Sequence, residues 1–595
     1  MNKKRIATIC LAALSTIMVS AKNGPVKMWE GTIDLPTYRV DAPERAPLFE
    51  RDFAYQRAKR GVYPYAMNDN PTNVKVDSIH KALYLENDYI KLCVLPDIGG
   101  RLLYATDKTN GYEIFYRQHV IKPANVGMLG AWISGGVEWN VFHHHRATSQ
   151  YPIDYKLVDN GDGSKTIWVG EVENRHRMSW AIGLTLHPDK SYIEVTGRFF
   201  NNAQDRNSML HWNNVATHVN ENYQIIFPEN TDFGTYHHKN SFLRWPVADA
   251  EYCGNPDYAG KDISYWKNLP ALTGGSVFVY DLKDDFIGGY DHGKNAGTML
   301  AADHNINKGG KFWAWGPMNY GHEWDCKTLT DSDGAYVELM TGAYSDNQPD
   351  YCWINPHETK EFSAYWYGIR DLRHVNRGNA DATVNMDIDK SGAIHIAANV
   401  TQIRPSAKIT VTGREGKVLY EKTSYIAPDK PFADDFKVSP DDVAEPTEVT
   451  LTLKSAEGEE LISYHPYALD RSKPLPEPVT PLDPDPKSID NIEDLYYIGM
   501  RNLQFHQAHV DPNIYFEEAV RRDPYDVRSN TQLGIFYRQN GDYAKAKEYL
   551  RRSLKRQTAS YTRPADGESM YNLGLVLKAE GNYDAATDTL YRAVW

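Results

Sequence analysis

Short runs of alternating apolar and polar residues fill most of the first two thirds of the chain. Ser191–Phe199 alternates in this way, and Ala82–Asn87 and Tyr89–Leu95 are further short runs with β character. A period of two is typical of a half-buried strand, and turn-forming residues such as Asn160–Gly163 separate the runs. No long helical period interrupts them. The pattern therefore predicts a large antiparallel β-sandwich over residues 80–375.

A second β region follows the first. Ala407–Thr412 and Glu448–Leu453 alternate cleanly, and the length of the region, residues 376–470, suits a small immunoglobulin-like β-sandwich. Residues 471–490 are dense in proline, which favours an extended, semi-rigid linker.

The first 21 residues have the features of a secretory signal peptide. Three basic residues precede the apolar run Ile6–Val19, and small residues at the end of the run predict cleavage after Ala21. The run is too short to span a bilayer stably, so we expect a secreted or periplasmic protein without a membrane span. Residues 22–79 then show one strand, Trp29–Pro36, in an otherwise irregular N-terminal region.

After residue 490 the period becomes helical and repeats. Small and large residues recur forty positions apart: Leu533 and Leu573, Gly534 and Gly574, Tyr537 and Leu577, Gly541 and Gly581, Tyr543 and Tyr583, Ala546 and Ala586, Leu550 and Leu590. This pattern resembles the tetratricopeptide repeat, whose period is about 34 residues. Residues 491–595 are therefore predicted to be such repeats, with a concave surface for a protein partner. Because the sequence stops at Trp595 inside a predicted helix, we expect further repeats or docking of this end.

Charge and composition narrow the ligand. The net charge is −13 and becomes −16 without the basic residues of the signal peptide, which argues against nucleic acid. Aromatic residues make up 12% of the chain and suit a sugar, which has polar edges and apolar faces. The four cysteines beyond the signal peptide lack Cys-x-x-Cys spacing, so we expect free thiols or at most one disulfide and no cysteine-based zinc site.

Three stretches of the predicted large sandwich resemble the galactose mutarotase-like superfamily, which includes the aldose 1-epimerases. They are Asn87–Arg101, Arg198–Asn202 with Asn214–His218, and Gly334–Gly342 with Asp346–Asp350 and Pro356–Glu358. The resemblance implies a β-supersandwich in which Glu338 occupies the position of the catalytic glutamate and His218 that of a catalytic histidine. Gly130–Asn140 and Glu338–Gly342 also resemble an exported bacterial family that pairs this domain with tetratricopeptide repeats and has no assigned reaction.

Two glutamates are the main candidates for chemistry. Glu338 lies on a strand of apolar and small residues, where a carboxylate is costly unless it faces a polar cavity or a partner. Glu138 follows two glycines, and the flanking Trp132 and Trp139 are candidates for a sugar-stacking platform. Two carboxyl groups are what glycoside hydrolysis requires.

Other polar and aromatic residues complete the predicted site. His218 and His144 are candidates for proton transfer. Substrate binding is assigned to the following residues: Trp132, Trp139, Asn140, His143, His145, Trp212, Asn214, Trp315, Glu323 and Asp325. Glu323 or Asp325 is the alternative second carboxylate. Three adjacent histidines lack the usual zinc spacing, so no metal and no cofactor is predicted.

The sequence favours an exported glycoside hydrolase that acts on an oligosaccharide or polysaccharide through a carboxylate pair. An aldose 1-epimerase with a glutamate base and a histidine acid is one alternative. A non-catalytic glycan-binding protein, with a protein partner on the repeats, is another.

Overall fold

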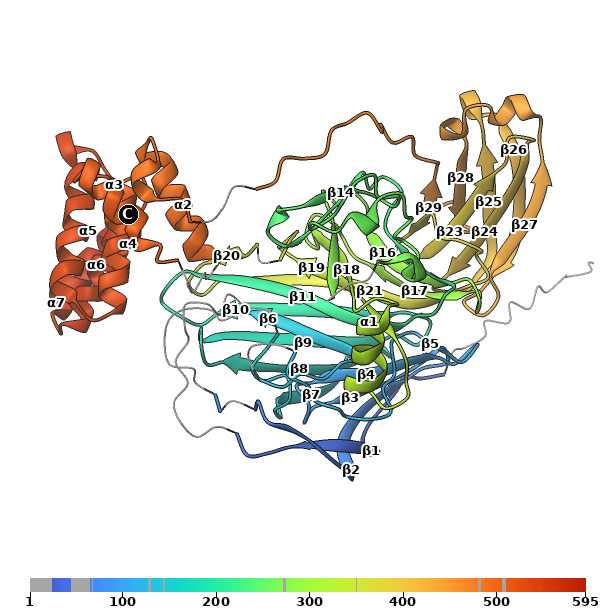
Figure 1. Cartoon of the computed structure of the whole chain (residues 1–595), viewed down its shortest axis with the longest axis horizontal. Coiled ribbons are helices and arrows are strands. Elements are labelled where there is room, and N and C mark those ends of the chain that lie inside the picture. The colour runs from blue at the N-terminus through green and yellow to red at the C-terminus, as the bar shows by residue number, and fades with distance from the viewer. Residues whose placement is uncertain are drawn as a thin grey trace, which may run out of the picture.

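The computed structural model describes residues 24–43, 65–66, 68–126, 130–142, 145–270, 274–348, 350–479, 483–505 and 510–594. The predicted signal peptide (1–21), His143, His144 and Trp595 lie outside them. In the described residues a large β-sandwich is followed by a small β domain, an extended segment and a helical unit (Figure 1). This is the predicted fold class.

Two antiparallel sheets form the large sandwich. The first has thirteen of the described strands, in the spatial order β1 (Lys27–Val40), β2 (Pro71–Glu86), β3 (Ile90–Leu95), β4 (Arg101–Asp107), β6 (Val137–Phe142), β11 (Asn207–His218), β19 (Tyr336–Ala343), β18 (Gly309–Ala314), β15 (Gly275–Val279), β13 (Phe233–Thr235) and β14 (Phe242–Arg244), with β5 (Tyr112–Glu113) on β4 and β20 (Cys352–Ile354) on β11. The second has eight, in the order β12 (Tyr223–Ile226), β16 (Phe286–Asp291), β17 (Ala296–Ala301), β21 (Thr359–Arg370), β10 (Ile193–Asn201), β9 (Met178–Leu186), β8 (Lys165–Glu173) and β7 (Asp154–Asp159).

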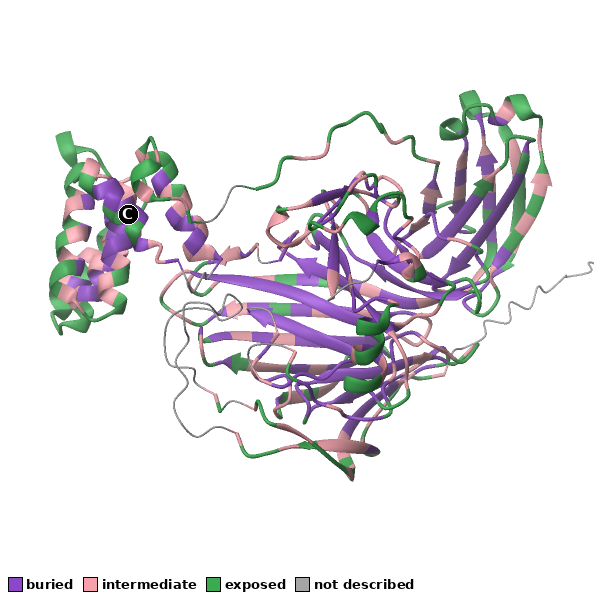
Figure 2. Cartoon of the chain, viewed as in Figure 1, coloured by how far each residue is buried: buried purple, intermediate pink, exposed green. Residues whose placement is uncertain are grey.

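The main hydrophobic core lies between these two sheets, whose strands are largely buried (Figure 2). Alternate residues of the central strands point into it, among them Trp139 of β6, Val215 of β11 and Leu339 of β19. The ring of Trp139 stacks on that of Trp366 from the second sheet, with 5.9 Å between the ring centroids. The residues between them on β6, β11 and β19 therefore point to the opposite face of the first sheet.

The N-terminal region is more regular than the sequence predicts. Instead of one short strand in irregular sequence, β1 and β2 pair from Lys27 opposite Glu86 to Tyr38 opposite Lys75, and β2 continues into the first sheet. Most of this pair is partly or fully exposed. A strand pair that is exposed over most of its length shows little alternation of apolar and polar residues. These two strands form through the hydrogen bonds between their backbones, which no local sequence pattern records.

The small β domain has two four-stranded sheets over the described residues. One is β22 (Arg377–Gly378), β23 (Ala382–Ile388), β24 (Ala393–Val400) and β27 (Phe432–Lys437); the other is β26 (Val418–Ile426), β25 (Arg404–Thr412), β28 (Thr450–Lys454) and β29 (Glu460–Tyr464). Apolar residues of both sheets meet in one core.

Three helix pairs form the C-terminal unit. They are α2 (Ile492–Gln504) and α3 (Asn513–Arg522), α4 (Val527–Gln539) and α5 (Tyr543–Gln557), and α6 (Glu568–Ala579) and α7 (Tyr583–Val594). A Cβ atom on Gly534 would lie 2.6 Å from Leu550, and one on Gly574 would lie 2.6 Å from Leu590. The repeated glycines are thus needed for close helix packing. No helix in the described part of the chain is both long and apolar enough to cross a membrane.

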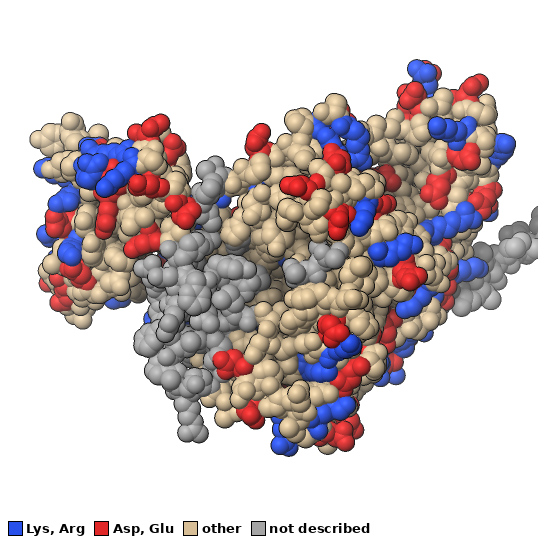
Figure 3. All heavy atoms as spheres, in the orientation of Figure 1, with Lys and Arg blue, Asp and Glu red and all other residues tan. Residues whose placement is uncertain are grey.

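Basic and acidic side chains alternate on the visible surface of the helical unit (Figure 3). Several are ion pairs between neighbouring helices, such as Arg528 with Glu493, Arg556 with Asp523 and Lys547 with Glu580. The arginines of the repeats are therefore largely compensated by carboxylates of the same unit.

Candidate active site

The candidate site lies on the face of the first sheet that points away from the main core. β6, β11, β19 and β18 are neighbours there, and their alternate residues share this face. The short helix α1 (Asn319–Glu323) lies in front of this sheet in Figure 1, and aromatic residues next to it pack on Ala216 and Tyr336 of the sheet. The face contributes the following side chains: Glu138, Asn140, Trp212, Asn214, Lys311, Trp313, Glu338 and Met340.

Glu138 and Glu338 stand on either side of β11. Glu138 is paired with Asn214 and Glu338 with Ala216, so their Cα atoms are about 12 Å apart by strand spacing and rise. Both side chains leave the sheet on the same side, and they are only 2% and 5% exposed. The structure thus brings the two glutamates predicted from the sequence to one buried polar face.

Glu138 is held as a carboxylate. Its Oε2 accepts hydrogen bonds from Trp132 Nε1 at 2.8 Å and from His145 Nδ1 at 2.9 Å. Burial by itself raises the pKa of Glu138, but the charges of His145 and Arg101 and these hydrogen bonds outweigh burial and lower the pKa to about 2. Its Oε1 has no hydrogen-bond partner among the described residues. That oxygen is buried as well as unpaired, so a partner for it must come from outside the described residues.

Glu338 has the opposite character. Burial raises its pKa above the ordinary value, the negative charge of Glu138 acts in the same direction, and the cations His145, Lys311 and Arg101 oppose the rise. Asn214 donates a hydrogen bond from Nδ2 to Oε2 of Glu338 at 3.1 Å. Two carboxyl groups on one face thus differ in protonation, one ionised and one poised to hold a proton.

Two cations complete the site and were not predicted. Arg101 is buried at the start of β4 and donates to the carbonyl oxygen of Gly135. Lys311 donates from Nζ to Gln348 Oε1 at 2.8 Å, and burial lowers its pKa. A signal existed for Lys311, because it is the single charged residue in the apolar strand Gly309–Ala314. The sequence offered a weaker indication for Arg101, which directly follows two glycines.

The two carboxylates proposed as alternatives behave differently. The side chain of Glu323 is 60% exposed and forms an ion pair with Lys327, so its assignment to the site was wrong: it lies on the solvent side of α1. Asp325 lies in the following π-helical turn, η4 (Trp324–Thr328), and is 1% exposed. Burial and the charge of Glu338 raise the pKa of Asp325 to about 9. No side chain of the described residues donates to its carboxyl oxygens, and the backbone of Tyr336 opposes the rise only in part.

Trp139 is the clearest correction among the aromatic residues. Its side chain lies in the main core and donates from Nε1 to the carbonyl oxygen of Gly100 at 2.8 Å, so it cannot stack on a ligand. Trp212 is on the site face but is fully buried beside Phe278 and Lys311. The sequence analysis assigned both residues to substrate binding, but the ring of Trp139 lies in the main core and that of Trp212 is fully buried.

Other predicted residues join the site or lie at its edge. Asn140 donates to Asn214 Oδ1 at 2.9 Å, which links it to Glu338. Trp315 stacks on Trp324 with 4.5 Å between the ring centroids and is largely buried.

His218 lies on β11 two residues beyond Ala216, the residue opposite Glu338, and so is on the same face of the sheet as Glu338. Its ring packs on Tyr116, and burial lowers its pKa to about 4. The charges that act on it belong to Lys294, Asp333 and His119, and Glu338 is not among them. His145 is instead the histidine whose charge acts on Glu338.

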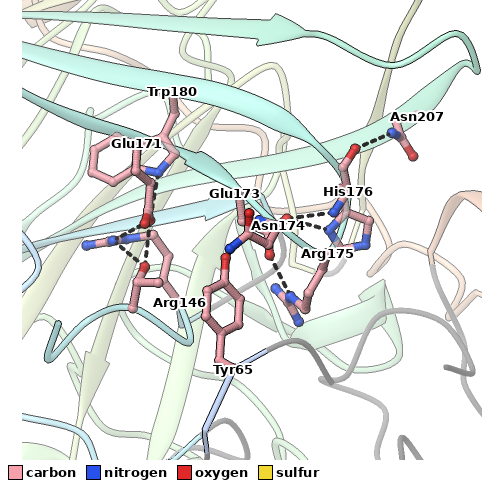
Figure 4. A network of polar contacts seen from close by, with 10 residues as sticks. Tyr65, Arg146, Glu171, Glu173, Asn174, Arg175, His176, Trp180 and Asn207 are labelled. Atoms are coloured by element: carbon pink, nitrogen blue, oxygen red, sulfur yellow. Dashed lines mark hydrogen bonds and ion pairs between the residues drawn. The ribbon is translucent and has the colours of Figure 1, made fainter. Parts of the chain in front are cut away.

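Arg146 fixes the segment that carries His145. Its guanidinium donates to the carbonyl oxygens of Trp139 and Gly99 at 2.8 and 2.6 Å. Figure 4 shows the same group beside Glu171 and Trp180, with an ion pair of 3.1 Å to Glu171 and 4.5 Å to the centre of the Trp180 ring. A buried arginine with this many partners holds the adjoining backbone in one position.

Comparisons with known proteins agree with this organisation. Residues 57–369 match the family described as Domain of unknown function (DUF5107), residues 377–464 match YphG-like protein, second domain, and residues 526–594 match Tetratricopeptide repeat.

Three solved structures are similar to all or part of this chain. A TPR-domain containing protein from Parabacteroides distasonis ATCC 8503 is 17% identical, with a TM-score of 0.50, over 96% of this chain and 80% of that one. A galactose mutarotase-like protein from Clostridium acetobutylicum is 11% identical (49% of this chain, 96% of that one, TM-score 0.34). Another from Lactobacillus casei ATCC 334 is 9% identical (48% and 100%, TM-score 0.32). Because the first family match spans more than half of the sequence, the chain belongs to the DUF5107 family.

Proposed function

We propose that this chain is an exported glycoside hydrolase that cleaves an oligosaccharide or a polysaccharide. The observation that carries the proposal is the pair of buried glutamates on one face whose surroundings move their pKa values apart, down for Glu138 and up for Glu338. A protonated acid beside an ionised carboxylate is the pair that glycosidic bond cleavage needs. The resemblance of three sequence stretches to aldose 1-epimerases favours a sugar as the substrate.

Each glutamate has a defined task in this reaction. Glu338 gives its proton to the glycosidic oxygen as the bond from that oxygen to the anomeric carbon breaks. Glu138 either attacks the anomeric carbon through Oε1 or takes a proton from the water that attacks it. His145 and Arg101 keep Glu138 ionised, and the positive charge of the developing oxocarbenium ion is stabilised by the carboxylate.

One observation favours a second candidate, aldose 1-epimerisation. Glu138 raises the pKa of His145, as does Glu338, so His145 is held as a cation near Glu338. In an epimerase, His145 would protonate the ring oxygen and Glu338 would take the proton of the anomeric hydroxyl. Glu138 would then serve only to orient His145 through the 2.9 Å hydrogen bond.

Products distinguish the two reactions. The purified chain is incubated with a panel of neutral oligosaccharides and polysaccharides in ¹⁸O-labelled water, and products are identified by mass spectrometry. Hydrolysis yields shorter sugars that carry the label, whereas epimerisation changes optical rotation with no new chain ends. Binding of a glycan with neither change would support the third function, a glycan-binding protein.

The Arg146→Ala variant tests how the His145 segment is held. We expect kcat to fall about 10- to 100-fold with a smaller change in KM, because the reacting groups lose their alignment. The acidic limb of the pH–rate profile should also move to higher pH, since a displaced His145 no longer lowers the pKa of Glu138 as strongly. The readout is the rate of reducing-end release between pH 3 and pH 9.

Arg198→Ala is the matched control for this variant. Arg198 also has a carboxylate partner, Glu361, and a tryptophan beneath its guanidinium, Trp168, but it is exposed on β10. Equal loss of activity in both variants, or an unmoved acidic limb in Arg146→Ala, would reject the positioning role.

Replacing Asp325 by asparagine should make the protein more stable at alkaline pH. The pKa of Asp325 is about 9 in the folded chain, whereas an aspartate in an unfolded chain has a pKa of about 3.9. At pH values between these two pKa values, Asp325 keeps its proton in the folded chain and loses it in the unfolded chain. The free energy of unfolding therefore falls as the pH rises through this range. Asparagine removes this loss, and we expect the midpoint of thermal unfolding to rise by about 2–4 °C at pH 8.

The same measurement at pH 4 should show no gain for Asp325→Asn. Asp331→Asn is the control with the opposite sign, because hydrogen bonds from Lys122 and Lys75 outweigh burial and lower the pKa of Asp331 to about 2. That variant should lose stability at pH 8. A lower midpoint for Asp325→Asn at pH 8 would show that Asp325 is ionised in the folded protein.

A further inference from the structure

The inner helices of the repeat unit are already in contact with the large sandwich. Residues 204–208, from the end of the β10–β11 loop and the start of β11, lie against them: Tyr571 donates to the carbonyl oxygen of Gln204 at 2.7 Å, and Ser208 donates to that of Gln504 at 2.7 Å. Arg538 of α4 forms an ion pair with Asp205. A folded partner protein therefore cannot lie on this side of the helices without displacing the sandwich.

A cavity of about 860 Å³ remains between the two units. Its walls come from residues 204–208 of the sandwich, from β20 and from the helices α2, α3, α4 and α6. This size lies within the range of small-molecule sites, and junctions between domains are common places for them. The cavity is separate from the candidate active site, because Leu210, Trp212, Tyr351 and Phe505 form a packed cluster along β11 between them.

The lining of the cavity is rich in amides and aromatic rings. Nine of its 24 residues are asparagine or glutamine, and they come from both units. An amide offers donors and an acceptor together, which suits hydroxyl groups that also do both. Phe536, which is 36% exposed, and Tyr571 add ring surfaces, whereas Phe516 is buried and the Trp353 ring lies beneath Arg206.

Charge restricts the ligand further. Arg206 is the one lysine or arginine among the described lining residues, and it is occupied: its guanidinium lies 4.5 Å from the centre of the Trp353 ring and 3.6 Å from Glu568. Acidic residues outnumber it in the lining. A phosphate, a uronic acid or a peptide carboxylate would thus find no unpaired cation here, whereas a neutral sugar needs none.

We propose that the cavity between the repeat unit and the large sandwich is a second carbohydrate site that binds a neutral oligosaccharide. The choice of a carbohydrate rests on the proposed function, since such a site would hold the glycan that the active site cleaves. In this interpretation the repeats are a wall of an intramolecular glycan site. They are not a platform for another protein on this side.

The test uses the full chain with Glu338→Gln, so that cleavage does not consume the ligand. Cellohexaose, xylohexaose, mannohexaose and maltohexaose are titrated by calorimetry, first alone and then after Phe536→Ala or Gln539→Ala is added. We expect one hexasaccharide to bind and each cavity variant to weaken one binding event at least tenfold. Tyr583→Ala is the matched control, because Tyr583 is an exposed aromatic of the same unit outside the cavity and should leave binding unchanged.

Several outcomes would overturn the inference: no hexasaccharide binds, binding is equal in the cavity variants and in Tyr583→Ala, or a neutral capped Gly-Ser peptide binds in a manner sensitive to Phe536→Ala. Thermal unfolding of each variant excludes a loss that comes from misfolding, and Gln539→Ala serves as a second variant with an exposed side chain. Cavity binding by a chain that cleaves no glycan would reject the proposed function and leave this site standing. Cleavage of a glycan without binding in the cavity would reject the second site and leave the proposed function standing.

Discussion

The Glu338→Gln variant is expected to cleave the substrate glycan about 10³-fold more slowly than the wild-type chain. Glutamine keeps the size of the side chain and an oxygen for the hydrogen bond from Asn214, but its amide is far too weak an acid to protonate a departing oxygen. The measurement is the initial rate of reducing-end release at saturating glycan. Glu323→Gln is the control: Glu323 is exposed and pairs with Lys327, so this variant should retain the wild-type rate.

The pH dependence of the wild-type rate follows from the same group. Burial raises the pKa of Glu338, so the protonated acid persists to a higher pH than for an ordinary glutamate. The rate should therefore fall as the pH rises through this raised pKa, and the fall should be missing from the residual activity of Glu338→Gln. A variant with wild-type kcat, or a wild-type rate that increases over this range, would contradict the role of acid.

The Glu138→Gln variant is expected to show a loss of similar size, about 10³-fold in kcat, because a neutral amide neither attacks the anomeric carbon nor activates water. His145 should also lose its cationic character, since Glu138 is the group that most strongly raises its pKa against burial. Glu194→Gln is the matched control. Glu194 also pairs with a histidine, His187 at 2.7 Å, but on the second sheet and away from the site.

A second measurement separates the chemical role of Glu138 from a structural one. Sodium azide is added to the Glu138→Ala variant, in which the shortened side chain leaves room for a small anion. Attack by azide on the anomeric carbon forms a glycosyl azide while Glu338 protonates the leaving oxygen. Recovery of glycan cleavage with this product supports the assignment. Wild-type cleavage by Glu138→Gln would reject the role of Glu138 in hydrolysis.

The sequence identified the two glutamates of the site but not its cations. Glu338 was chosen as a carboxylate on an apolar strand and Glu138 because it follows two glycines between two tryptophans, and both lie on the same buried face. Arg101 and Lys311 are distant in sequence from each other and from Glu138. Only the order of β4, β6, β11, β19 and β18 in the sheet brings them together.

Alternation alone left the aromatic residues ambiguous. Every residue of β6 and of β19 is buried, so the strands are covered on both faces, and a period of two cannot tell which face meets the core. Trp139 was expected beside the ligand because it flanks Glu138 in the sequence, but it lies between the sheets, one position away from Glu138. Glu323 and Asp325 were ambiguous for a related reason. They are two positions apart along a helical turn, and the carboxylate of Glu323 is exposed whereas that of Asp325 is buried.

By itself, the sequence determined the classes of element: short alternating strands, a second small β region and helices with a repeated pattern of glycine and leucine. These follow from local periodicity, which side-chain burial imposes on every strand and helix. The tertiary structure alone decided that the N-terminal strands join the large sheet, that His145 pairs with Glu138, and that the repeats face the sandwich across a cavity. Such features depend on contacts between residues far apart in the chain, which no local pattern records.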